Sequence, residues 1–224
     1  MKPKPTPELN WEFETQAGWQ NMPWIVGLDE VGRGCLAGPV VTCALALPFG
    51  WAEAKLADSK ALNSRKREEL WQVLLQSRTQ GHIHWETSYG SVDQIDKINI
   101  LHASEQAMSA ALSKLCTRVQ HLPSQCLIAV DGHRTLQHVS CSAVVGGDSK
   151  VVAIAGASVI AKVVRDRWMK LLDASCPGYG FAVNKGYGTI EHRKALAKLG
   201  PTVFHRRSFS PVRQPTLPGL EWED

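Results

Sequence analysis

The chain has 224 residues, of which 44% are hydrophobic and 21% are charged, and its formal net charge is +4. A length and an apolar fraction of this size suit one globular domain with an ordinary core. No apolar run approaches the length of a membrane span, and the Pro- and Lys-rich start lacks the apolar segment of a signal peptide. Both observations argue against a membrane or secreted protein.

The distribution of charges and cysteines indicates the kind of partner and the cellular compartment of the protein. Residues 1–112 carry ten Lys and Arg against thirteen Asp and Glu, whereas residues 113–224 carry fifteen against eight. The basic second half suits an anionic partner, although a solvated surface alone would look similar. The six cysteines form no C-x-x-C pair, which favours free thiols in a reducing compartment over disulfides or zinc. We therefore predict a cytoplasmic protein.

The predicted elements begin with residues 1–22, which we expect to form a flexible extension. An apolar run over residues 24–28 predicts a buried strand that ends on two adjacent carboxylates, Asp29 and Glu30. Such carboxylates usually meet a cation or lie in a cleft, because burying unpaired charge is costly. The alternative is a hydrophilic turn. Consecutive strand residues also point to opposite faces, so both can bind one ion only if the strand becomes irregular there.

A glycine-rich loop follows the acid pair. Arg33 lies between Gly32 and Gly34, where the backbone can approach a ligand closely and the guanidinium can grip a phosphate. A second apolar run over residues 40–47 predicts the next strand. The order of strand, acid pair, glycine loop and strand is suited to holding a metal ion beside a polyanion.

The middle of the chain alternates helix and strand patterns. Asn63 or the next residue can cap a helix over about residues 65–76. Residues 82–87 alternate apolar and polar side chains, which predicts a half-buried strand. Ser91 begins a long helical stretch that Pro123 ends.

Two further apolar runs are followed by carboxylates. Residues 126–130 predict a short buried strand that ends on Asp131, and the run over residues 143–145 precedes Asp148. Three strands of this design can bring four carboxylates to one edge of a sheet. Oxygen-only ligands favour Mg²⁺ or Mn²⁺ over zinc. Two such ions would clamp the attacking and leaving oxygens of a phosphodiester displacement.

The last third of the chain predicts two helices. Residues 151–173 are rich in small side chains, which permits close packing on a sheet, and residues 190–199 predict the second helix. Asp166 on the first helix lies between two arginines, so an ion pair is favoured over a metal ligand. The Pro-rich tail, residues 213–224, is expected to be flexible.

Taken together, the motifs of the chain resemble those of the ribonuclease HII family. They occur in the family's order and cover about residues 24–212. The matching segments are GLDEVGRG (27–34), LAGPVV (36–41), DSK (58–60), INIL (98–101), VDG (130–132), GDSK (147–150), ASVIAKV (157–163), RDR (165–167), PGYGF (177–181), KGYGT (185–189), EH (191–192) and HRRSF (205–209).

The resemblance implies an α/β, RNase H-like fold, with a mixed five-stranded central sheet flanked by helices and a small C-terminal helical segment. Residues 23–212 would form the catalytic domain, including a C-terminal substrate-binding segment. The implied activity is endonucleolytic hydrolysis of the RNA strand of RNA–DNA hybrids. It includes cleavage 5′ of ribonucleotides embedded in duplex DNA, giving 3′-hydroxyl and 5′-phosphate ends, with roles in ribonucleotide excision and RNA primer removal.

The resemblance also implies residue roles. The metal-binding and catalytic acids would be Asp29, Glu30, Asp131 and Asp148, with two Mg²⁺ or Mn²⁺ ions per site in the presence of substrate. Gly32, Arg33 and Gly34 match the loop that senses the 2′-hydroxyl. Tyr187 matches the tyrosine that packs on the next sugar. The resemblance points to a phosphate contact for Lys60, although this residue could instead only decorate a loop. Phosphate contacts are also expected from Lys185, Arg206 and Arg207, which lie close to Tyr187 in sequence, although the two arginines could instead only neutralise the surface. The partners would be RNA–DNA hybrids and ribonucleotide-containing duplex DNA. We expect the protein to be a monomer that does not associate with a membrane.

Two other interpretations stay open at this point. One is a catalytically silent binder of hybrids, although clustered acids would repel the polyanion that it binds. The other is the related ribonuclease HIII family, which carries a substantial N-terminal substrate-binding domain. The chain departs from the usual family pattern at Cys35, His133 and Gly156, none of which is a carboxylate position.

Overall fold

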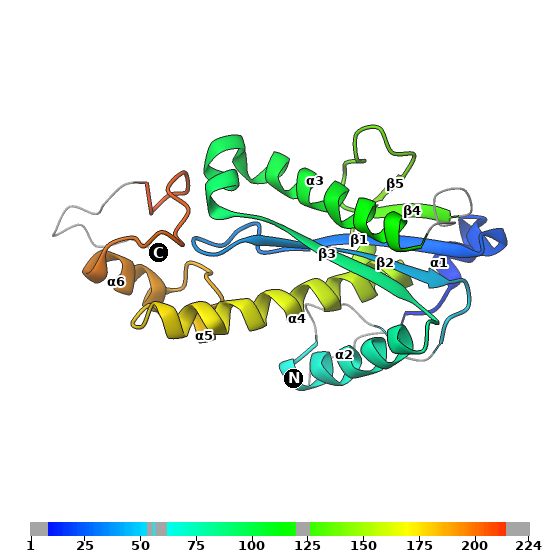
Figure 1. The fold of residues 1–224 in the computed structure, drawn as a ribbon, viewed down its shortest axis with the longest axis horizontal. Coiled ribbons are helices and arrows are strands. Elements are labelled where there is room, and N and C mark those ends of the chain that lie inside the picture. The colour runs from blue at the N-terminus through cyan, green and yellow to red at the C-terminus, as the bar shows by residue number, and fades with distance from the viewer. Residues whose placement is uncertain (1–8, 53–55, 57–61, 120–125, 214–224) are drawn as a thin grey trace, which may run out of the picture.

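The computed structural model describes residues 9–52, 56, 62–119 and 126–213. Its centre is a five-stranded sheet with the strand order β3-β2-β1-β4-β5 (Figure 1). The pairs β1–β2 and β2–β3 are antiparallel, and the pairs β1–β4 and β4–β5 are parallel. The predicted mixed five-stranded sheet is therefore confirmed. The strands are β1 Trp24–Val31, β2 Val40–Pro48, β3 His84–Gly90, β4 Cys126–Asp131 and β5 Ser142–Val144.

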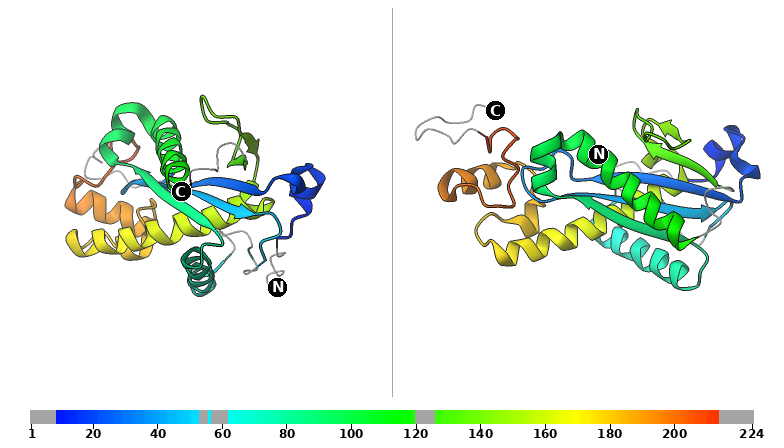
Figure 2. Two further views of the ribbon diagram at one scale, coloured as in Figure 1. Left: turned by 45° about the vertical axis from the view of Figure 1, so that its right-hand side comes forward. Right: turned by 45° about the horizontal axis from the view of Figure 1, so that its top comes forward.

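Helices cover both faces of this sheet. The long helix α3 (Val92–Arg118) lies on one face, and α4 (Val152–Ser175) crosses the other with α2 (Ser64–Thr79) beside it (Figures 1 and 2). Because strand residues alternate between faces, Ile25 belongs to the core on the α4 side and Val26 to the core on the α3 side. Both faces of β1 are thus buried, which is why its sequence is a nearly continuous apolar run.

Small residues allow α4 to pack directly on the central strands. A Cβ atom added to Gly27 would lie 2.1 Å from the backbone carbonyl carbon of Ala153. One added to Gly156 would lie 2.4 Å from a methyl carbon of Leu45. The close packing predicted from the small residues of this helix is confirmed, and Gly156 departs from the family pattern at a contact with the sheet.

The predicted boundaries are close to the observed ones. Asn63 caps α2, accepting a hydrogen bond from the Lys66 amide at 2.9 Å, and Ser91 caps α3 in a reciprocal capping box with Gln94. Asn99 interrupts α3 with a left-handed φ of 65°. Strand β3 extends to Gly90 rather than ending at residue 87, because its pairing with β2 continues to that point. The predicted stop at Pro123 lies outside the described residues.

An N-terminal segment packs against the sheet domain. It contains the short helix α1 (Glu12–Gln16) and the 3₁₀ turn η1 (Trp19–Asn21). Glu14 is fully buried and accepts a hydrogen bond from the Val152 amide at 2.8 Å, at the start of α4. Burial raises the pKa of Glu14, and the helix amide opposes this rise. The segment overlaps the expected flexible extension over residues 1–22 and supplies the cap that α4 lacks in its own sequence.

The opposite end of the molecule carries the small C-terminal helical segment (Figure 1). It contains α5 (Phe181–Asn184) and α6 (Ile190–Leu199). A separate apolar cluster of Ala37, Met169 and Phe181 joins it to the loop after β1 and to the end of α4. Within the described residues, no helix is long and apolar enough to cross a membrane.

Candidate active site

The sheet brings the predicted acids to one edge. Strand β1 runs parallel to β4, and their last paired residues are Leu28 and Val130, so Asp29 and Asp131 follow on adjacent strands. Asp148 lies in the 3₁₀ turn η3 (Gly147–Ser149), which follows β5. The Gly147 amide donates a hydrogen bond to Asp131 Oδ1 at 2.7 Å, which ties this turn to the end of β4.

Asp29 and Glu30 nevertheless face different surroundings, because β1 stays regular past the acid pair. Asp29 pairs with Cys43, and Glu30 pairs with Thr42. Asp29 is 4% exposed and forms a hydrogen bond with Ser158 on α4. Glu30 instead lines an open hollow on the α3 side, together with Arg33 and Asp131. The irregular strand required for a shared ion is thus not present within β1.

The carboxylates of the edge disfavour one another's charge. Burial raises the pKa of Asp29 well above its ordinary value, and the charges of Glu30 and Asp131 add to the rise. Burial also raises the pKa of Glu30, which the neighbouring Arg33 guanidinium partly offsets. Within the described chain, no three carboxylate, histidine or cysteine side chains form a ready-made group of metal ligands. The four predicted acids offer only carboxylate oxygens, which suit a hard divalent cation. A cation would also stabilise the charged forms of Asp29 and Glu30, whose pKa values are raised.

The loop after β1 places Arg33 beside these acids. Arg33 Nη1 lies 3.0 Å from Glu30 Oε1, and the arginine side chain is 51% exposed. Gly32 has a left-handed φ of 96°, and an added Cβ would lie 2.2 Å from Arg165 Nε. At Gly34, by contrast, an added Cβ would have no protein atom within 4 Å. The first glycine is needed by the fold, and the second leaves open space on the outer side of the loop.

Two fully buried arginines hold this loop by donating hydrogen bonds to its carbonyl oxygens. Arg165, on α4, donates to the carbonyl oxygens of Pro39, Ala37 and Lys185 at 2.9, 3.1 and 2.8 Å. It thereby joins the loop to the segment that precedes Tyr187. The guanidinium offers five donors in a fixed plane, so one side chain can bind several carbonyls at once.

Arg206 is the second buried arginine, and the phosphate contact predicted for it is wrong. Its guanidinium donates to the carbonyl oxygens of Gly32, Arg33 and Gly38 at 2.7, 2.8 and 3.0 Å, and no part of the residue is exposed. Burial lowers its pKa to about 10, so it remains a cation at neutral pH. Its role is to position the loop. The sequence pattern of adjacent basic residues cannot separate this buried arginine from its exposed neighbour Arg207.

The remaining predicted substrate residues lie around the loop. Tyr187 is 41% exposed, its ring centroid lies 5.9 Å from Lys162 Nζ, and its hydroxyl forms a hydrogen bond with the buried Cys35 thiol. Lys185 is partly buried and donates to the carbonyl oxygen of Ala182. Arg207 is exposed, and Lys60 lies outside the described residues.

Two secondary predictions are confirmed. Asp166 forms an ion pair with Lys162 at 2.7 Å. All six cysteines are free thiols. Sequence reasoning did not find Arg165, His192 or His205 as organising residues. All three residues lie within segments that match the family pattern, and this match is the only signal in the sequence that could have indicated them.

A mixed sheet in this strand order, with carboxylates at the ends of β1 and β4 and after β5, defines the RNase H-like class of nucleases. A family profile described as Ribonuclease HII matches residues 26–212. The chain is 42% identical over 224 residues to the ribonuclease HII of Parvibaculum lavamentivorans, covering 99% of this chain and 79% of that protein. The chain therefore belongs to the ribonuclease HII family.

Solved structures support the fold. The ribonuclease H2 of Pyrococcus horikoshii matches with a TM-score of 0.67 and 22% identity, over 86% of this chain and 96% of that one. Bst-RNase HIII in complex with Mn²⁺ matches with a TM-score of 0.68 and 20% identity, over 88% of this chain and 70% of that one. By its family membership, the protein is a divalent-metal-dependent ribonuclease that hydrolyses RNA paired with DNA.

Proposed function

We propose that the enzyme cleaves on the 5′ side of a ribonucleotide embedded in duplex DNA, leaving a 3′-hydroxyl and a 5′-phosphate. The observation that carries this proposal is the adjacency of the acid edge and the loop: Arg33 pairs with Glu30, and the loop also contacts the Tyr187 segment. Such an enzyme would act in ribonucleotide excision and RNA primer removal. The monomeric state and the cytoplasmic location stay predictions.

Asp29, Glu30, Asp131 and Asp148 would hold two Mg²⁺ or Mn²⁺ ions when substrate is bound. The bound ions would supply Lewis-acid stabilisation of the attacking and leaving oxygens. Because Asp29 and Glu30 now face different sides of β1, we expect their side chains to turn toward Asp131 on binding. Burial, with a smaller contribution from neighbouring carboxylates, raises the pKa of Asp29 and Glu30, and a bound cation would offset both causes because it stabilises the charged form.

The glycine loop would recognise the 2′-hydroxyl, because phosphate contacts alone cannot tell RNA from DNA. Arg206 already donates to the carbonyl oxygens of Gly32 and Arg33, and the loop's amides would offer hydrogen-bond donors to the sugar. The open space beside Gly34 is where the sugar would approach. Tyr187 would pack on the next sugar and favour a deoxyribose, which leaves room that a ribose hydroxyl fills.

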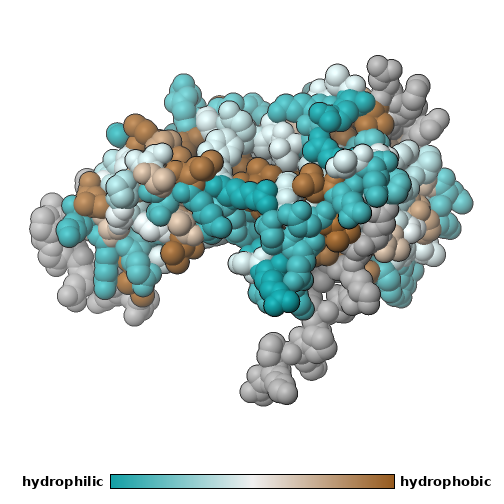
Figure 3. Space-filling view, turned by 60° about the horizontal axis from the view of Figure 1, so that its bottom comes forward, coloured by the Kyte–Doolittle hydropathy of each residue, from teal (hydrophilic) through white to brown (hydrophobic). Residues whose placement is uncertain are grey.

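A basic hollow supports a path for the rest of the duplex. Lys185 lines it with Arg65, Arg167 and Lys170, between the start of α2 and the middle of α4. Figure 3 shows hydrophilic residues over α2 and an indentation between α2 and the end that carries α5 and α6. Cations at such a position would contact phosphates without reading sequence. We keep Lys185, Arg207 and Lys60 as proposed phosphate contacts.

The test is cleavage of a DNA duplex that contains one ribonucleotide, with Mg²⁺, with Mn²⁺ and with chelator. The products are mapped on a sequencing gel beside those of an all-RNA strand paired with DNA. We expect metal-dependent cleavage of both, with a single cut 5′ of the embedded ribonucleotide. Binding of both duplexes without cleavage in either metal would favour the silent binder. Cleavage of the long hybrid alone would favour a specificity of the ribonuclease HIII kind.

A further inference from the structure

Two histidines that the proposed mechanism does not use meet inside the C-terminal segment. His192 lies on the first turn of α6, and His205 follows that helix on the segment leading to Arg206. They are 0% and 1% exposed, and their Nε2 atoms lie 3.1 Å apart. A buried pair of imidazoles can share one hydrogen only if one ring donates and the other accepts.

The neighbours determine which ring donates. The Thr202 amide donates to His205 Nδ1 at 3.0 Å, so this nitrogen is an acceptor and the ring hydrogen is on Nε2. His205 therefore donates to His192 Nε2. The hydrogen of His192 is then on Nδ1, which donates to the carbonyl oxygen of Tyr187 at 2.8 Å. Burial lowers the pKa of both rings, that of His205 to about 4, which keeps them neutral as this chain of hydrogen bonds requires.

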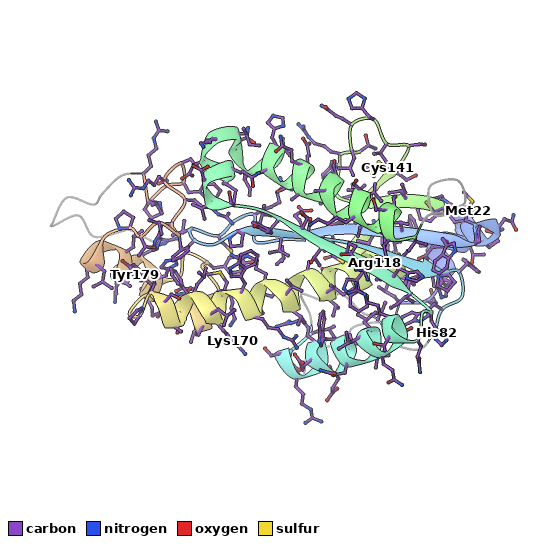
Figure 4. The ribbon with its side chains drawn as sticks, viewed as in Figure 1. Met22, His82, Arg118, Cys141, Lys170 and Tyr179 are labelled. Atoms are coloured by element: carbon purple, nitrogen blue, oxygen red, sulfur yellow. The ribbon has the colours of Figure 1, made fainter. Side chains whose placement is uncertain are left out.

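Aromatic packing fixes both imidazoles in place. Tyr179 and Phe181 stack at 5.4 Å, and their ring centroids lie 4.9 and 5.5 Å from that of His205. His192 and Phe181 form a T-shaped pair, with ring centroids 5.4 Å apart and an interplanar angle of 89°. Tyr179 is itself held by a 2.6 Å hydrogen bond to the Gly200 carbonyl, at the end of the molecule that carries α6 (Figure 4). The rings therefore cannot turn without breaking several contacts.

The hydrogen-bond chain ends at the residue proposed to sense the second sugar. Around Tyr187 the backbone is bent, with left-handed φ values of 54° at Lys185 and 80° at Gly186. Gly186 in turn accepts a hydrogen bond from the Leu36 amide at 2.8 Å, and Ala37 forms a β-bridge with His205. One connected network thus sets the position of the Tyr187 backbone relative to the glycine loop.

We propose that His192 and His205 are positioning residues for sugar discrimination, holding Tyr187 in register with the loop of Gly32–Gly34. This inference rests on the proposed function, because it needs Tyr187 to contact the sugar that follows the ribonucleotide. The histidines touch neither the substrate nor the acids. They act through the carbonyl of Tyr187. The hydrogen bond that His192 Nδ1 donates to this carbonyl is the contact that holds the Tyr187 backbone in place.

Matched substitutions can test which nitrogen matters. An Asn amide nitrogen lies near the place of Nδ1, and a Gln amide nitrogen lies near the place of Nε2. At position 192, His192→Asn keeps the donor to Tyr187 and His192→Gln loses it. At position 205 the order reverses, because His205→Gln keeps the donor toward His192 and His205→Asn loses it. The readout is the ratio of kcat/KM for a single embedded ribonucleotide to that for an all-RNA strand paired with DNA.

We expect the two donor-keeping variants to preserve this ratio within about twofold, and the two donor-losing variants to lower it about tenfold. The melting temperature of each variant is measured in parallel. Ratios that follow the loss of melting temperature rather than the place of the amide would overturn the inference. If one pair does not fold, the reversed pair at the other position still decides.

Tyr187→Ala separates this inference from the proposed function on which it rests. If Tyr187→Ala leaves the ratio unchanged, the tyrosine is not the junction sensor and the proposed specificity fails. If Tyr187→Ala lowers the ratio while Asn and Gln at positions 192 and 205 behave alike, the sensor stands and the histidine inference fails.

Discussion

The acid edge of this enzyme and its proposed sugar-recognition end, made of the glycine loop and the Tyr187 segment, are held by different means. Asp29, Glu30 and Asp131 lie at the ends of regular strands, so backbone pairing in the sheet sets their positions. The turn that carries Asp148 is tied to β4 by the hydrogen bond from the Gly147 amide to Asp131. The glycine loop and the Tyr187 segment have irregular backbone, and buried Arg165, Arg206 and His192 bind their carbonyl oxygens. The acid edge contains groups whose charge is costly, whereas the recognition end is held by neutral or cationic donors. The sheet positions the acids proposed for catalysis, whereas buried side chains that bind backbone carbonyls position the segments proposed for specificity.

The largest effect is expected from breaking the acid edge. Asp131→Asn keeps the acceptor of the Gly147 amide but removes the charge of a proposed metal ligand. We expect kcat/KM to fall by three or more orders of magnitude, which is about 4 kcal/mol of transition-state stabilisation. Single-turnover cleavage with Mg²⁺ measures it, with thermal unfolding as the control. Near-normal turnover would remove Asp131 from the metal site.

Breaking the recognition end should damage stability first. Arg206→Leu leaves the carbonyls of Gly32, Arg33 and Gly38 without their donor, so we expect a loss of about 3 kcal/mol or more in the free energy of unfolding. The exposed neighbour offers a matched control, since Arg207→Leu should cost no more than about 0.5 kcal/mol. Urea unfolding of both variants measures the difference, and equal losses would contradict the structural role of Arg206.

Gly32 and Gly34 allow the structural role of the loop to be separated from its proposed role in sugar recognition. Gly32→Ala should lower the melting temperature, because its Cβ would meet Arg165 and its φ of 96° is strained for alanine. Gly34→Ala should leave the melting temperature unchanged and lower cleavage by about tenfold, because the added methyl group enters the space proposed for the sugar. Normal cleavage by a folded Gly34→Ala protein would show that the sugar does not approach there.

The raised carboxyl pKa values predict how pH affects the metal-free protein. A carboxyl group whose pKa is raised by folding destabilises the native state once it ionises. Its penalty is absent below the ordinary carboxyl pKa, grows as pH rises toward the raised value, and is constant above it. Asp29→Asn should remove the part of this penalty that comes from Asp29, so the free energy of unfolding of the metal-free protein should be higher in the variant at neutral pH. Urea unfolding in chelator across that pH range measures it. If the free energy of unfolding falls with rising pH as much in Asp29→Asn as in the unchanged protein, or more, Asp29 is not the source of the penalty.

The smallest effect concerns surface cations. Lys185→Ala should reduce the slope of log affinity against log salt by about one, if Lys185 contacts a phosphate. Arg206→Leu should leave that slope unchanged wherever it still folds, because its charge is buried. Binding to a hybrid duplex in Ca²⁺ or chelator at several salt concentrations measures the slopes. A smaller slope for Arg206→Leu would mean that its charge does reach the substrate.

Much of the fold and the acid edge could be predicted, because these features depend on local patterns. Apolar runs that end on Asp29, Asp131 and Asp148 indicate strands and carboxylates together, and the small residues of α4 indicate close packing. The ordered motifs indicated the family and the strand arrangement. Helix caps at Asn63 and Ser91 depend only on neighbours a few residues away, so they too could be predicted.

Only the tertiary structure decided what the irregular segments do. Adjacent arginines in the sequence differ in role because Arg206 alone reaches three carbonyls of a loop more than 160 residues earlier in the chain. Asp29 and Glu30 separate onto two faces because pairing with β2 keeps β1 regular past them. The His192–His205 contact joins a helix to a later segment. Such contacts depend on which backbone atoms are brought together by folding, and no local periodicity records that.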